Sequence, residues 1–191
     1  MTEWKKRLKD ILEPALVLPD PRPKISAYHD MPYAIFLYPP EDEFALRKEI
    51  ALLKTRLEQA GKRVTVISLA ECLWEGLNSE ISLPEFIEAE RSMGIDKAIE
   101  TAHEIISVNR PLPDLVAKRI PADAMPMKDV AFIVRAGALF PIYRTSALLE
   151  KLQGKVFVPA ILFYPGLLDG PAGLKFMGVL EAEHNYRPKI F

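Results

Sequence analysis

The chain has 191 residues, which is enough for a full apolar core and predicts a single α/β domain over residues 1–191. Its 25 lysines and arginines nearly balance 26 aspartates and glutamates, and this excludes a general electrostatic attraction to nucleic acid or anionic lipid. One cysteine, Cys72, excludes an intramolecular disulfide and is typical of a reducing compartment. Without an apolar run of about 20 residues or a signal-like N-terminus, we expect a cytoplasmic protein with no membrane contact.

An amphipathic helix is predicted over about residues 2–18. Apolar residues that include Trp4 and Leu8 recur at helical spacing, and Lys5 and Arg7 belong to the basic remainder of its surface. Such a helix can pack on the domain with its basic face in solvent. It can also present that face to a membrane, an acidic partner or DNA, so these four residues are candidates for partner binding.

Four apolar segments predict strands of a mostly parallel sheet. They comprise residues 33–38, 63–68, 129–134 and 155–163. The first is apolar on both faces, as in a sheet covered by helices on both sides, and segments of helical periodicity separate the strands. Residues 186–191 predict a final edge strand, because Pro188 cannot donate to a neighbour. We therefore expect an α/β fold with about four to five strands flanked by helices.

A helical insertion is predicted between the second and third strands, over about residues 82–120. Ser82 and Glu85 have the spacing of a capping box, which opens a helix. Gly94 is expected to divide the segment into two helices. The insertion is longer than one crossover needs and can form a small helical lobe.

Prolines and glycines are expected to interrupt this pattern in three places. Pro14 should end or kink the first helix, and the proline-alternating segment 19–24 should be extended. Residues 164–173 carry three glycines, whose spacing matches neither a P-loop nor a dinucleotide-binding turn. This segment is therefore expected to be a shaped surface loop, with a phosphate cradle as the weaker alternative.

Residues with recognisable catalytic or metal-binding spacing are not evident. The first strand-to-helix turn, residues 39–43, has no glycine, and its three carboxylates would repel a phosphate. His29, His103 and His184 are far apart in sequence, and Cys72 sits among apolar neighbours as a buried, inert thiol would. We therefore expect no catalytic residues, no metal and no cofactor.

Two arginines are the most distinctive charged residues. Arg135 ends the third predicted strand, and Arg144 begins the next helix. Together they can clamp a phosphate or carboxylate at the strand ends, where Tyr164 is also expected. The alternative is a structural salt bridge to Glu71 or Glu75.

Eight segments in order resemble the BrxB family, small subunits of bacterial BREX phage-defence systems. They are residues 37–43, 61–69, 111–114, 132–136, 143–149, 162–166, 173–178 and 186–191. The resemblance implies a role in restricting phage DNA and partnership with PglZ, a large subunit of alkaline-phosphatase type. It transfers no catalytic motif.

The leading hypothesis is thus a non-enzymatic adaptor of a BREX complex that binds a PglZ-like protein. Its contact surface is expected on the N-terminal helix and the helical insertion. Two alternatives remain: binding of a phosphorylated ligand or nucleotide through Arg135 and Arg144, and DNA binding through the basic N-terminal helix.

Overall fold

A six-stranded sheet forms the centre of the computed structural model, which describes residues 2–26, 28, 31–170, 173–184 and 186–191. His29, considered above as a metal ligand, lies outside these ranges. Five strands follow the order β2-β3-β4-β1-β6 and are parallel, and β5 pairs antiparallel with β4. The strands are β1 (Tyr33–Tyr38), β2 (Arg63–Ser68), β3 (Asp129–Val134), β4 (Ala160–Asp169), β5 (Gly173–Phe176) and β6 (Lys189–Ile190). The predicted α/β fold is confirmed, and β6 occupies the expected edge.

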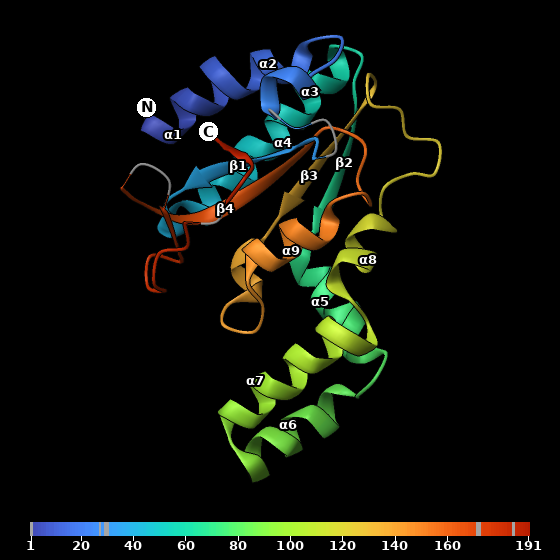
Figure 1. The fold of residues 1–191 in the computed structure, drawn as a ribbon, viewed down its shortest axis with the longest axis vertical. Coiled ribbons are helices and arrows are strands. Elements are labelled where there is room, and N and C mark those ends of the chain that lie inside the picture. The colour runs from blue at the N-terminus through green and yellow to red at the C-terminus, as the bar shows by residue number, and fades with distance from the viewer. Residues whose placement is uncertain (1, 27, 29–30, 171–172, 185) are drawn as a thin grey trace.

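Helices cover both faces of this sheet (Figure 1). One face carries α1 (Glu3–Arg7), the π-helical η1 (Leu8–Leu12), α2 (Glu13–Val17), α3 (Arg22–Ile25) and α4 (Glu43–Gln59). The other carries α5 (Leu69–Asn78), α8 (Leu112–Ala117) and α9 (Thr145–Leu152). Farther from the sheet lie α6 (Leu83–Met93) and α7 (Ile95–Glu104), which continues into η3 (Ile105–Asn109). Short 3-10 turns follow β1 and β3, namely η2 (Pro40–Asp42) and η4 (Ala136–Leu139).

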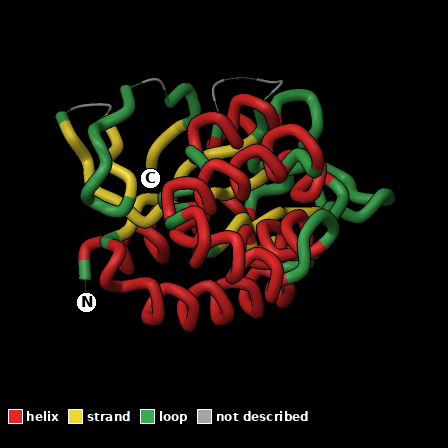
Figure 2. The backbone as a smooth tube through the Cα atoms, turned by 90° about the horizontal axis from the view of Figure 1, so that it is seen from below, coloured by secondary structure: helices red, strands yellow, loops and turns green. Residues whose placement is uncertain are grey.

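Alternating side chains of β1 divide the apolar core into two layers. Tyr33, Ile35 and Leu37 pack towards α5, α8 and α9, whereas Ala34 and Phe36 pack towards α4 and the N-terminal helices. Every residue of β1 is buried, as the prediction of a strand covered on both faces requires. Figure 2 shows the helices gathered around the strands, with both chain ends at the same side of the molecule.

The N-terminal segment differs from its prediction at the prolines. Pro14 does not end the helix, which passes through the wider π-helical turn of η1 and continues to Val17. The segment 19–24 is not wholly extended either, because α3 begins at Arg22. Asp20 accepts a hydrogen bond from the Arg22 backbone N–H at 3.1 Å and pairs with its guanidinium, which stabilises this helical turn.

The glycine-rich segment after Phe163 is largely strand, so the prediction of a surface loop was wrong for residues 164–169 and for Gly173. β4 continues to Asp169 and pairs antiparallel with β5, while residues 171–172 of the predicted loop lie outside the described ranges. At Gly166, a Cβ atom would collide with the Tyr164 ring and the Lys175 carbonyl, so only glycine allows the strands to pair here. β4 also begins later than expected, at Ala160 rather than residue 155.

The helical insertion follows its prediction closely. Ser82 and Glu85 form the expected capping box, and α6, α7 and α8 lie between β2 and β3. Gly94 separates α6 from α7 with a φ of +87°, a left-handed conformation that side chains other than glycine rarely adopt.

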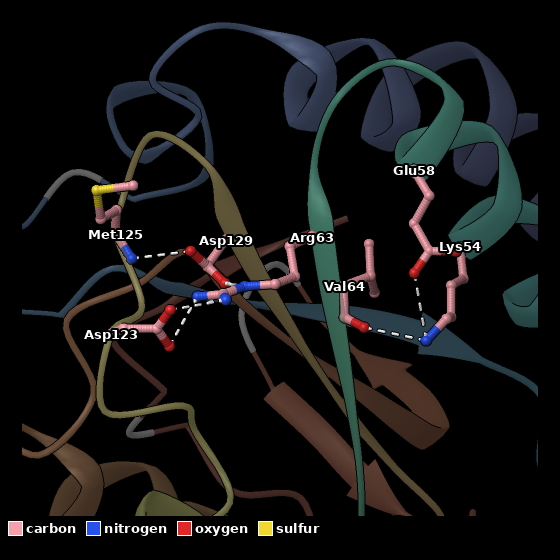
Figure 3. Close-up of polar contacts among 7 residues, drawn as sticks. All are labelled: Lys54, Glu58, Arg63, Val64, Asp123, Met125 and Asp129. Carbon is pink, nitrogen blue, oxygen red and sulfur yellow. Dashed lines mark hydrogen bonds and ion pairs between the residues drawn. The ribbon is translucent and has the colours of Figure 1, made fainter.

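Polar anchors hold β2 at its N-terminal end. Arg63 pairs with the buried carboxylate of Asp129 on β3 and with Asp123, while Asp129 also accepts a hydrogen bond from the Met125 N–H at 2.8 Å (Figure 3). These two aspartates raise the pKa of Arg63 by hydrogen bonding to its guanidinium. Nearby, Lys54 donates to the Val64 carbonyl at 3.1 Å, which ties α4 to the same strand.

Lys62 is the most buried lysine anchor. Its ammonium donates to the carbonyls of Leu18, Pro19 at 3.2 Å and Met127 at 2.8 Å, so it joins the end of the N-terminal helix to the segment before β3. Burial lowers the pKa of Lys62, and the three carbonyls replace its hydration.

We expect Lys62→Met to lower the free energy of unfolding by about 1–3 kcal/mol, because three carbonyls lose their donor. Urea denaturation followed by circular dichroism would measure this. The matched control is Lys54→Met, which removes one carbonyl contact and the ion pair with Glu58 from a half-exposed lysine and should cost about 1 kcal/mol or less. Equal losses in the two variants would contradict the anchoring role of Lys62.

Candidate functional site

A cleft of about 280 Å³ opens outside the carboxyl ends of β1, β3 and β4. After β1 the chain passes to α4 on one face of the sheet, whereas after β3 it passes through η4 to α9 on the other. Departure to opposite faces leaves a crevice between the two connections, which is where open α/β sheets bind ligands. The lining includes Pro40, Glu43, Arg47, Arg135, Pro165 and Met177.

Arg135 enters this cleft from the end of β3, as its position in the sequence predicts. Its backbone is left-handed, with φ 61° and ψ 38°, and its Nε is buried without a hydrogen-bond partner among the described residues. Met177, which also lines the cleft, is left-handed as well, with φ 55°. Outside glycine, no further positive φ occurs in the described ranges, so both strained non-glycine residues found there line the cleft.

Arg47 supplies a second guanidinium from the first turns of α4. Its Nε donates to Glu43 at 2.8 Å, and its guanidinium lies over the Phe44 ring, 5.2 Å from the centroid. Glu43 also accepts a hydrogen bond from the Tyr38 hydroxyl, whose pKa is raised by burial and by this carboxylate. Two donors thus engage Glu43, which reduces the repulsion that the acidic turn was expected to exert.

Arg144 lies elsewhere, so the structure does not bring it together with Arg135. Its side chain is 74% exposed and pairs with Glu183 at 3.1 Å, not with Glu71 or Glu75. It lines a different hollow of about 820 Å³, together with Tyr33, Glu150 and Tyr186.

Tyr164 belongs to the core rather than to the cleft surface. It is 0% exposed and packs against Phe176 and edge-on to Tyr186. Burial is the main cause that raises the pKa of its hydroxyl.

Three of the four N-terminal candidates have structural contacts deep in the fold. Trp4 and Leu8 are each 2% exposed in the core, and the Trp4 indole donates to Asp42 at 2.7 Å. Arg7 donates to the Leu37 carbonyl at 2.8 Å, and burial lowers its pKa. Lys5 is more exposed and pairs with Glu49 at 3.0 Å.

Comparison with known proteins identifies the family of this chain. The model of the family described as "BREX protein BrxB" matches residues 65–190, about two thirds of the chain. The chain belongs to the BrxB family. A protein of Bacillus cereus (strain H3081.97) with the same description is 29% identical over 164 residues, which are 83% of this chain and 82% of that protein. No solved structure matches.

The BrxB family match includes Arg135, Arg144 and Tyr164 but begins after Arg47. Sequence reasoning missed Arg47, because a Glu43–Arg47 pair at i,i+4 is the usual pattern of a solvated helix face. One feature of the sequence could have indicated that Arg47 lines the cleft: it lies in the first turns of the helix that follows a predicted strand. No comparable feature of the sequence indicated Met177.

Three further features of this BrxB-family chain concern metal binding, membrane crossing and its single thiol within the described ranges. In the ranges that the structure describes, no three histidine, cysteine or acidic side chains meet as metal ligands would. Nor does any helix there have the length and apolar character needed to cross a bilayer. Cys72 is fully buried, and burial raises its pKa to about 11.

We expect the Cys72 thiol to be nearly inert in the folded chain. Its pKa rises from 9.0 to about 11, so at pH 8 the thiolate fraction falls about 100-fold relative to the unfolded chain, and burial adds steric protection. Labelling with Ellman's reagent at pH 8, with and without denaturant, would measure this. A Cys72→Ala variant carrying Ser92→Cys on exposed α6 is the control and should label quickly when folded. Rapid labelling of native Cys72 would contradict the prediction.

Proposed function

We propose that this chain is a non-enzymatic adaptor in a BREX phage-defence complex and binds a PglZ-like large subunit through α6 and α7. Membership in a family of BREX proteins supports the role in defence. The PglZ-like partner and the lack of catalysis follow from the resemblance set out above. The surface is inferred from the structure.

The observation that carries this proposal is the exposure of α6. None of its residues is buried, although several are large and apolar. Leu83 is 46%, Ile87 39% and Met93 58% exposed, and Ile95 at the start of α7 is 57% exposed. Leu83 and Ile87 are four residues apart, so they share one helix face. Exposed apolar side chains on one face of a projecting helix are typical of a protein-binding surface.

One end of the α6–α7 helix pair is anchored to the domain. Ala102 of α7 and Ile105 and Ile106 of η3 are buried in the core beside α5, and Phe86 of α6 packs against the same layer. The far ends of α6 and α7 extend away from the sheet (Figure 1). A rigidly anchored helix pair can bind a partner with little loss of conformational entropy.

The N-terminal helix offers less free surface for this partner or for DNA. Trp4 and Leu8 would have to leave the core to contact either, and Arg7 would have to release the Leu37 carbonyl. We therefore assign the main contact to α6 and α7 and leave Lys5 as a peripheral contact at most.

We expect the double variant Leu83→Glu with Ile87→Glu to weaken binding to the PglZ-like protein at least tenfold. Each large apolar side chain buried in an interface contributes on the order of 1.5–3 kcal/mol, and a carboxylate there would be desolvated. Co-purification from a strain that expresses both proteins, followed by calorimetric titration, would measure the affinity.

Leu52→Glu on α4 is the matched control, since Leu52 is 54% exposed on the other side of the sheet. It should leave the affinity unchanged. No complex at micromolar concentration would refute the partner, equal loss in both variants would refute the surface, and turnover of a phosphoester substrate by the purified chain alone would refute the non-enzymatic role.

A further inference from the structure

We propose that the cleft between Arg47 and Arg135 is a binding site for a small phosphate-bearing ligand. The site goes beyond the adaptor role and does not depend on it. Its ligand class is a tetrahedral phosphate, either free or as the terminal group of a small molecule.

The cleft has more hydrogen-bond donors than the chain supplies acceptors for. In the guanidinium of Arg47 only the Nε has a hydrogen-bond partner, Glu43. The side chain of Arg135 makes no hydrogen bond or ion pair with any described residue. The Nη groups of both arginines are therefore free to donate within the described part of the chain. Guanidinium forks bind phosphate oxygens in pairs, which suits two arginines facing one anion.

The charge balance of the cleft also favours an anion. Arg47 and Arg135 carry two positive charges, and Glu43 carries one negative charge that two donors already engage. The acid next to it, Asp42, is turned away and accepts from the Trp4 indole at 2.7 Å. The N-terminal end of the 17-residue helix α4 adds a partial positive charge at the same place.

Backbone strain gives an independent indication of a functional site. Arg135 and Met177 both hold left-handed conformations that cost on the order of 1–2 kcal/mol for a residue with a side chain, and both line the cleft. Glycine would occupy these positions without strain. Arginine at position 135 instead directs a charged group into the crevice at the expense of stability.

The size of the cleft limits what it can hold. At about 280 Å³ it is at the small end of ligand pockets. Pro40, Pro165 and Met177 form apolar walls around the two guanidinium groups. This combination suits a phosphate with a small organic group rather than a dinucleotide.

The test is calorimetric titration of the purified chain at low ionic strength with inorganic phosphate and, separately, with adenosine 5′-monophosphate. Binding of phosphate alone identifies a free-ion site, and tighter binding of the monophosphate identifies a phosphoester site; both support the proposal. Arg135→Gly should lower the affinity at least about tenfold, while its melting temperature stays equal or rises because the strain is relieved. Arg47→Gln should lower the affinity to a similar extent.

Arg144→Gln is the matched control, because Arg144 is an exposed arginine paired with Glu183 outside the cleft. It should leave the affinity unchanged. The proposal is overturned if neither ligand binds at millimolar concentration, if Arg135→Gly binds as tightly as the unaltered chain, or if Arg144→Gln loses as much affinity as the cleft variants.

Discussion

The parallel pairing of β1 with β4 is the interaction on which the rest of this structure depends. It joins residues 33–38 to residues 160–165 in continuous register, although more than 120 residues separate them in the chain. Both helix layers pack on these strands, because Phe36 and Phe163 face α4 while Ile35 and Leu162 face the α5 side. The same register brings the turn after β1 beside Pro165, and so creates one wall of the cleft.

Local sequence patterns correctly predicted the elements that depend only on residues adjacent in the sequence. β1, β2 and β3 begin and end where the apolar segments do, and Gly94 divides the insertion, since each depends on residues adjacent in sequence. The β4–β5 hairpin was missed for the opposite reason. In the sequence, Gly166 is typical of a loop. In the structure, its lack of a Cβ atom allows the Tyr164 ring and the Lys175 carbonyl to lie close to its backbone.

The candidate site was predictable only in part, for the same physical reason. Arg135 was found because a residue at the end of a parallel strand reaches the carboxyl edge of the sheet wherever the strand lies. The prediction that Arg144 lies beside it was wrong: Arg144 is close in sequence, but η4 and the segment leading to α9 carry it to a separate hollow beside Glu183. Arg47 reaches the cleft through the strand order, in which β4 separates β1 from β3, and the sequence alone does not give that order.

The two proposed surfaces have separate structural origins. α6 and α7 project from the helix layer that begins after β2, within the part of the chain that matches the family model. The cleft combines Arg135 from that part with Arg47 from α4, which precedes it. A partner bound to the exposed face of α6 and the start of α7 would leave the carboxyl edge of the sheet open on the α4 side. If both proposals hold, the chain can bind its partner and a small phosphate-bearing ligand at the same time, and α5, which contacts both η3 and η4, is one element through which the two sites can be coupled.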